Sequence, residues 1–228
     1  DGKSLYGPAD IDERDQVIRS KDPHVGEGSV IAILDTGFAL DHPSFTMPKG
    51  ISYTIEEEDI PTLCKDTYVI FRQTREKIGE TYISQKIPFA YDYADEDPDV
   101  FSSNSHGTHV AAIAAGSGDL MGAAPGAQIL LMKVFSDDTK TCSEQTLLMA
   151  MEDAVKLGAD VINLSLGTLS MSSTYLGMGR LAGAIRSAQS KGVTVICAIG
   201  NDGRAGGGGA DSDFFRATDP DYGLVSEP

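Results

Sequence analysis

Basic residues are scarce in this sequence, which has 18 lysines and arginines against 34 aspartates and glutamates in 228 residues. The resulting net charge of −16 argues against nucleic acid or an anionic membrane surface as a partner, because both would repel the chain. No apolar run reaches the length of a membrane span, and no signal peptide opens the chain. A start at Asp1 fits either a mature product that has lost its export segments or a trimmed chain.

Cysteine is also rare. Cys64, Cys142 and Cys197 are odd in number and lack metal-type spacing, so we expect no metal centre from them. Cys197 lies in an apolar run and is expected to be a small core residue. With 41% apolar residues, the chain is long enough for one well-buried domain. It shows no repeat and no internal domain boundary.

Apolar runs and helical patterns alternate along the chain. This alternation is typical of an α/β fold with three layers, a parallel sheet carrying helices on both faces. For the second helix, Thr141 and Glu144 predict a capping box and Gly158 predicts the end. The expected strands are 30–34, 128–135, 160–164 and 193–199, and the expected helices are 106–115, 143–157 and 178–191.

Two stretches carry chemistry. The first is residues 105–116, a helix of small residues that we expect to begin at His106, with Ser105 as its N-cap and Gly116 as its stop. The second is a buried strand that ends at Asp35. An open α/β sheet places its chemistry at the carboxyl ends of its strands, where an aspartate can hold a histidine in its useful tautomer.

Four segments resemble the motifs of the subtilisin-like serine proteases, the subtilases, in family order. They are Asp35-Thr36-Gly37, His106 to Val110, Ile162 to Gly167, and Ala198 to Gly203. Residues 86–95 and 217–223 further resemble the large bacterial cell-envelope branch that contains lactocepin and C5a-peptidase-like enzymes. The resemblance implies a subtilisin-like fold, hydrolysis of peptide bonds, and a secreted or cell-envelope location in bacteria.

The resemblance also assigns roles to individual residues. His106 would be the general base, Asp35 would orient it, and Asn201 would donate to the oxyanion, while His109 would be structural. An extended peptide substrate would add as a strand to the backbone of Ser165, Leu166 and Gly167. No cofactor is required. Many family members hold calcium through an aspartate at the position of Ser44, and serine there argues against that site.

The nucleophile is missing. The family places it after the asparagine segment in a Gly-Thr-Ser motif, which does not occur there; Ser170 lies too early, and Ser212 and Ser226 lack the flanking pattern. We therefore expect residues 1–228 to be the N-terminal part of one subtilase catalytic domain, incomplete on its C-terminal side. The serine would lie on a C-terminal companion segment packed against this chain, which alone would be inactive and poorly stable because of an exposed apolar edge. The alternative is a catalytically inactive subtilase-like binding or scaffold protein.

Other segments carry weaker expectations. Residues 1–29 read as an N-terminal arm, with a short helix over 12–18, and residues 46–100 as an insertion near the cleft, with 46–85 as surface decoration. The acidic group before the histidine helix reads as an exposed loop, with a weak calcium site or a patch for basic substrate side chains as alternatives. Its members are Asp92, Asp95, Glu96, Asp97 and Asp99.

Two other protein classes share single features with this chain. Aspartic proteases also use Asp-Thr-Gly, but they need two such motifs on β-rich lobes, and the motif occurs once here. Dinucleotide-binding domains share the alternation of strand and helix, but no Gly-x-Gly-x-x-Gly follows the first strand. Both classes are therefore disfavoured.

Overall fold

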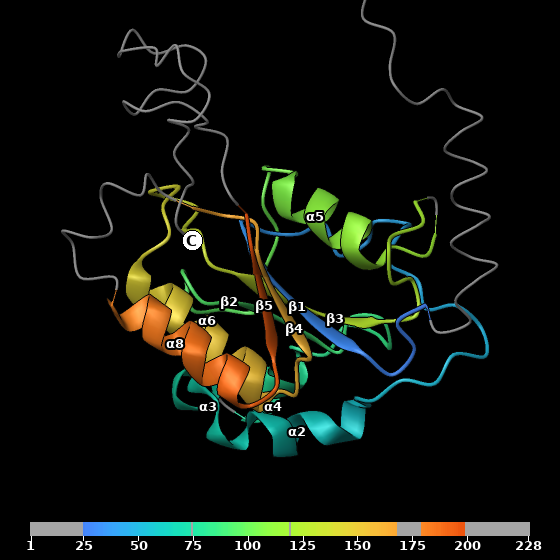
Figure 1. The fold of residues 1–228 in the computed structure, drawn as a ribbon, viewed down its shortest axis with the longest axis horizontal. Helices are drawn as coiled ribbons and strands as arrows, with labels where there is room; N and C mark the ends of the chain where they lie inside the picture. The colour runs from blue at the N-terminus through green and yellow to red at the C-terminus, as the bar shows by residue number, and fades with distance from the viewer. Residues whose placement is uncertain (1–24, 74, 119, 168–178, 199–228) are drawn as a thin grey trace, which may run out of the picture.

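The computed structural model describes residues 25–73, 75–118, 120–167 and 179–198. Its centre is a sheet of five parallel strands in the order β2-β3-β1-β4-β5 (Figure 1). Because β1 is the middle strand, its carboxyl end lies at the centre of one edge of the sheet. The strands are β1 (Val30–Asp35), β2 (Phe89–Asp92), β3 (Gln128–Lys133), β4 (Val161–Leu164) and β5 (Thr194–Cys197).

Strands β1, β2 and β3 are almost wholly buried. Every residue of β3 is buried, and so is every residue of β1 except the half-buried Ile31. In β1, Ala32 and Leu34 pack into the core on one face of the sheet, whereas Ile33 packs into the core on the other. Both faces therefore need apolar side chains, which explains why these strands read as continuous apolar runs in the sequence.

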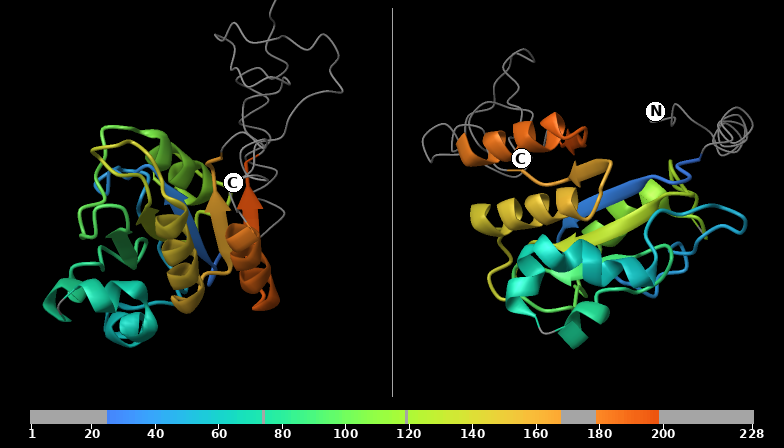
Figure 2. Two further views of the ribbon diagram at one scale, coloured as in Figure 1. Left: turned by 90° about the vertical axis from the view of Figure 1, so that its left-hand side faces the viewer. Right: turned by 90° about the horizontal axis from the view of Figure 1, so that it is seen from below.

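Helices cover both faces of the sheet. Helix α5 (His106–Ala115) lies over β1 and β3 on one face, and α6 (Glu144–Lys156) packs beside α8 (Gly179–Ser190) on the other (Figures 1 and 2). This confirms the predicted three-layer α/β architecture. It also brings the first residue of α5 above the carboxyl edge of the sheet, beside the end of β1.

Residues 57–73 and 75–79 form short helical turns on the α6 side of the sheet (Figure 2). Their buried side chains, among them Ile60, Cys64 and Val69, belong to the same core as α6. The prediction of surface decoration for 46–85 is therefore wrong. Each turn contributes at most one buried side chain, which is too few to give a helical period in the sequence. The turns are η1 (Glu57–Asp59), α2 (Ile60–Leu63), η2 (Cys64–Asp66), α3 (Tyr68–Arg72) and α4 (Arg75–Gly79).

The start of α6 differs from the prediction. Ser143 is the N-cap: its backbone is extended, and its Oγ accepts a hydrogen bond from the amide of Thr146 at 3.0 Å. Thr141 bonds the side chain of Thr139 instead, so the predicted capping box does not form. Gly158, with φ of +86°, follows the helix as predicted.

Several expectations fall outside the described residues. They concern the helix over 12–18, the oxyanion residue Asn201, the tail 217–223, and the serines at 170, 212 and 226. Among the helices that the structure describes, none is long and apolar enough to cross a membrane.

Candidate active site

Asp35 is the last residue of β1, and it is buried, with 1% of its surface exposed. Ile33 packs under α5, and side chains alternate along a strand, so Asp35 points to the same side of the sheet. Its Oδ1 accepts a hydrogen bond from the amide of Thr36 at 2.7 Å, which fixes the carboxylate at the turn that leaves the strand.

Two glycines let helix α5 and the segment that precedes it approach this turn. Gly37 has a φ of +137°, and a Cβ there would lie 2.5 Å from the Cβ of Ser102 and 2.9 Å from the carbonyl oxygen of Val100. A Cβ on Gly107 would lie 2.5 Å from the carbonyl oxygen of Gly37 and 3.1 Å from the side chain of Asp35. The glycines of both sequence motifs are thus explained by close contact between backbones.

Helix α5 begins at His106, as predicted, but its cap differs. Ser105 has helical dihedral angles (φ −77°, ψ −1°), and its hydroxyl makes no capping hydrogen bond. The side chain of Asn104 caps instead, because its Oδ1 accepts from the amide of His106 at 3.0 Å. Ser105 fails as an N-cap because that position requires a non-helical backbone. The expected stop at Gly116 is confirmed as the C-cap residue.

The imidazole of His106 and the carboxylate of Asp35 meet across 71 positions of sequence. His106 Nδ1 lies 2.7 Å from Asp35 Oδ1, and the histidine side chain is 50% exposed. When Nδ1 donates to the carboxylate, Nε2 is left as the basic nitrogen of the neutral ring. The second oxygen, Asp35 Oδ2, is buried and has no hydrogen-bond partner within the described residues. A buried carboxylate therefore orients a base that solvent can reach.

The predicted substrate segment lies beside this pair. Strand β4 pairs with β1 so that Leu164 is opposite Leu34, which places Ser165 next to Asp35 at the carboxyl edge. Ser165 and Leu166 are half-buried and Gly167 is exposed, so part of this segment is accessible to a ligand. Ala198, whose amide donates to the carbonyl oxygen of Leu164 at 3.0 Å, lies at the same edge.

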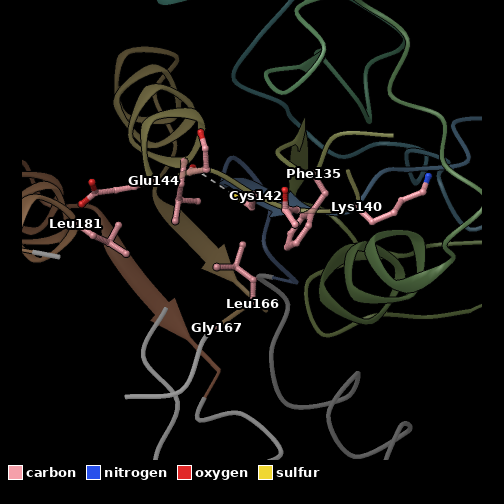
Figure 3. A pocket seen from close by; sticks show the side chains of 10 residues that line it. Phe135, Lys140, Cys142, Glu144, Leu166, Gly167 and Leu181 are labelled. Carbon is pink, nitrogen blue, oxygen red and sulfur yellow. Dashed lines mark hydrogen bonds between the residues drawn. The ribbon is translucent and has the colours of Figure 1, made fainter. Parts of the chain in front are cut away.

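A cavity of about 280 Å³ adjoins Leu166 and Gly167 (Figure 3). Phe135, Leu147 and Leu181 contribute apolar walls from the segment after β3, from α6 and from α8. Cys142 also lines it, and burial raises the pKa of this thiol to about 12, so the thiol stays protonated at neutral pH. Sequence reasoning missed this cavity because its walls come from segments far apart in the chain.

The acidic group before α5 is only in part the exposed loop that we expected. Asp92 ends β2, is buried, and forms an ion pair with Lys133 at the end of β3. Lys133 Nζ also lies 2.8 Å from Asp137 Oδ2 and 3.3 Å from Asp95 Oδ2. Within the described residues, Asp92, Asp95 and Asp137 form the one group of carboxylates close enough to share a metal ion. The ammonium of Lys133 already supplies the cation there, which argues against calcium at this cluster.

The pKa shifts in this cluster follow from burial and pairing. Burial raises the pKa of Asp92, although the hydrogen bond from Lys133 opposes the change. Burial also opposes the charged form of Lys133, but hydrogen bonds to Asp137 and Asp92 prevail and raise its pKa. Hydrogen bonding to Lys133 lowers the pKa of the more exposed Asp137. The lysine is therefore charged at every physiological pH.

The residues around Ser44 do not fit a calcium ion. Ser44 is fully buried; its Oγ accepts from the amide of Leu120 at 3.2 Å, and its carbonyl oxygen accepts from the amide of Ser117 at 2.9 Å. A hydroxyl that already accepts a backbone hydrogen bond brings none of the negative charge that calcium sites use. Direct hydrogen bonds thus connect the loop after Asp35 to the turn after α5.

Comparison with known proteins agrees with the resemblance noted in the sequence and with the contact between Asp35 and His106. The model of the subtilase family matches residues 26–218. The chain belongs to the subtilase family. This subtilase chain is 34% identical over 218 residues to the PI-type proteinase of Lactococcus lactis subsp. cremoris and 32% identical over 212 residues to the C5a peptidase of Streptococcus pyogenes serotype M3. The predicted similarity to the lactocepin and C5a-peptidase branch is confirmed.

Solved structures show the same fold. The prenylagaramide maturation protease PagA is 26% identical, with a TM-score of 0.51 over 82% of this chain and 51% of PagA. MycP1, at 22% identity and a TM-score of 0.56 over 86% of this chain and 49% of MycP1, shows likeness in fold alone. The matches cover 90% of this subtilase chain but 11% of the PI-type proteinase, and 89% of it but 17% of the C5a peptidase.

Proposed function

We propose that this chain supplies the histidine base and the orienting aspartate of a serine endopeptidase, and that the nucleophilic serine lies on a C-terminal segment of the same protein. The contact of 2.7 Å between His106 Nδ1 and Asp35 Oδ1 carries the proposal. Asp35 holds the tautomer in which Nε2 accepts the serine proton, and His106 then returns this proton to the leaving amine. The mechanism requires no metal or cofactor.

The oxyanion of the tetrahedral intermediate needs a donor, and we assign this role to the side-chain amide of Asn201. Loss of one such donor in subtilisin reduces turnover by about 10²–10³. The position of Ala198, three residues before Asn201 and bonded to Leu164 at the carboxyl edge, supports the assignment. Asp35, His106 and Asn201 would then surround the place that the serine hydroxyl must occupy.

Helix α5 covers one face of the sheet. We place the companion segment on that face, beside α5 and over β5. Helix α5 lies over β1 and β3, and on the same side of the sheet β5 exposes Thr194 and 51% of Ile196. Ile113 of α5 is 65% exposed. Covering these apolar side chains would stabilise both segments. The chain alone would accordingly be inactive and less stable than the complete protein.

The substrate would be a peptide in extended form. Its backbone would pair with Ser165, Leu166 and Gly167, and the adjoining cavity would take one of its apolar side chains. The named relatives are a proteinase and a peptidase from bacteria, which supports a protein substrate and, with the family resemblance, a secreted or cell-envelope location.

Labelling with a fluorophosphonate tests the proposal on the complete protein. We expect one serine outside the residues described here to be labelled, and we expect His106→Ala to abolish the labelling, because an unactivated serine reacts too slowly. His109→Ala is the matched control, since His109 is exposed and lies three residues further along α5. A complete protein that takes up no label would instead be a scaffold with a catalytic domain that has lost its activity.

A further inference from the structure

Three neighbouring strands end in charged residues that lie in register. Asp92 of β2 is opposite Lys133 of β3, and Lys133 is opposite Asp35 of β1. Neighbouring strands are about 4.8 Å apart, and residues in register point to the same side of a sheet. Lys133 therefore lies between two buried carboxylates, each 1% exposed, and both are within the reach of a lysine side chain.

Lys133 pairs with only one of these two neighbours. The ion pairs that the structure gives it go to Asp92, Asp95 and Asp137, on the side away from β1. Asp137 also lies 3.6 Å from Lys140. Within the part of the chain that the structure describes, the charged groups on or beside Lys133 are the three carboxylates that bind it, Lys140 next to Asp137, and Asp35 on the next strand.

Asp35 offers the lysine a second binding position. Its Oδ2 is buried and lacks a hydrogen-bond partner among the described residues. The lysine side chain also runs close to the turn after Asp35, since a Cβ on Gly37 would lie 3.2 Å from Lys133 Cδ. If Asp92, Asp95 or Asp137 lost its charge, Asp35 Oδ2 would offer the ammonium a buried acceptor on the neighbouring strand.

We propose that Asp92, with Asp95 and Asp137, acts as a positioning residue for the Asp35–His106 pair by holding the Lys133 ammonium away from Asp35. The carboxylate of Asp35 then serves His106 alone, and no buried cation competes for it. The inference rests on the proposed function in so far as the pair is catalytic, but the arrangement itself can be measured without turnover.

The test is the pH dependence of carbethoxylation of His106 by diethyl pyrocarbonate, which reacts with neutral imidazole. The complete protein is modified across a range of pH, and the rate at His106 is read from peptides by mass spectrometry. In Asp92→Asn, Oδ1 can still accept from the amides of Ala94 and Asp95, so the turn is retained. We expect the midpoint of the His106 profile to move to lower pH by about one unit or more, because a lysine that pairs with Asp35 reduces the stabilisation of the imidazolium.

A second variant separates positioning from general damage. In Asp92→Asn combined with Lys133→Met, the competing cation is gone, and we expect the His106 midpoint to return towards the wild-type value. If Asp92→Asn acted only by loosening the fold, removal of the lysine would not restore the profile. His109 is an exposed reference in the same peptide, and Asp138→Asn is the matched control, an exposed carboxylate next to Asp137.

The outcomes are distinct. An unchanged His106 profile in Asp92→Asn, or a shift that persists in the double variant, overturns the inference. A complete protein with wild-type and variant profiles as expected but with no serine labelled by fluorophosphonate supports the positioning of the pair and overturns the proposed protease function.

Discussion

Asp35 and Asp92 end two strands that flank β3, and both are 1% exposed, yet they have different partners. Asp92 pairs with the fully buried Lys133, whereas Asp35 pairs with a histidine whose side chain is 50% exposed. Lys133 keeps its proton at physiological pH, so the ammonium that pairs with Asp92 stays charged. The imidazole can gain and lose a proton in contact with solvent, which a catalytic base must do.

A third buried carboxylate, Asp153, lies on the other side of the sheet and extends the comparison. Its oxygens accept hydrogen bonds from the amide of Tyr68 at 2.8 Å and from the hydroxyl of Tyr93 at 3.1 Å, while Lys156 is 4.0 Å away. Asp153 thus connects α6 to the short helices and to the residue after β2 mainly through neutral donors. All three aspartates are buried, but their partners differ. Asp35 contacts a histidine, Asp92 pairs with a lysine, and Asp153 accepts mainly from neutral donors.

The largest effect is expected at the catalytic pair. Asp35→Asn removes the charge and can present its amide N–H to Nδ1, which favours the wrong imidazole tautomer. We expect kcat/KM of the complete protease to fall by about 10⁴-fold, the loss caused by the corresponding change in an unrelated Ser-His-Asp enzyme. Peptide hydrolysis measures this change. A variant within tenfold of wild type would exclude Asp35 from the mechanism.

The next effect concerns stability at the neighbouring strand. Asp92→Ala removes the buried partner of the Lys133 ammonium, and we expect a loss of about 3 kcal/mol in the free energy of unfolding. Hydrogen exchange of β2 and β3 peptides, read by mass spectrometry, reports this change. Asp99→Ala, in the same acidic segment, is the control, and an equal loss in both variants would contradict a specific role for the buried pair.

Because the pKa of Asp153 is raised, we expect the free energy of unfolding to depend on pH. Burial raises the pKa of Asp153 to about 6 from 3.8, although the hydrogen bond from the amide of Tyr68 opposes the change. The folded state therefore binds this proton more tightly than the unfolded state, so the contribution of Asp153 to stability is largest below pH 4 and is lost as pH rises through 6.

Replacement of Asp153 by asparagine tests that sign. The free energy of unfolding of Asp153→Asn, relative to wild type, should be higher at pH 7 than at pH 4.5 by about 2 kcal/mol, because asparagine avoids the burial of a charge. Hydrogen exchange of α6 at the two pH values, corrected for intrinsic rates, measures the difference. A relative stability that does not change with pH would mean that Asp153 has the same pKa in the folded and the unfolded chain, which would contradict the raised pKa.

The smallest effect concerns the start of α5. Asn104→Ala removes the side chain that accepts from the amide of His106, and we expect a loss of about 1 kcal/mol in the stability of this helix. Ser105→Ala should change it by less than about 0.5 kcal/mol, since Ser105 makes no capping hydrogen bond. Exchange rates of amides in α5 compare the two variants, and a larger effect at Ser105 would reverse our assignment of the cap.

The contact between Asp35 and His106 could be predicted from the sequence, whereas the groups around it could not. A buried strand that ends in Asp35 and a small-residue helix that begins at His106 are local patterns, and parallel pairing brings their ends together. The cap was mistaken because Asn104 and Ser105 are both good capping residues, and only the backbone angles distinguish them.

The partners of Lys133 show why longer-range features escaped prediction. The lysine follows five buried residues and gives no sign in the sequence that it meets Asp92, 41 positions earlier. The short helices over 57–79 gave no period because each contains only three to five residues. Packing between distant segments, rather than local preference, determines these features.

An experimental structure of the complete protein tests the central claim most directly. The account predicts a serine from the C-terminal segment with its Oγ about 2.6–3.2 Å from Nε2 of His106, on the side of the ring opposite Asp35. A structure in which the space beside Nε2 is filled by an apolar side chain, or in which no serine from any segment reaches it, would contradict the account.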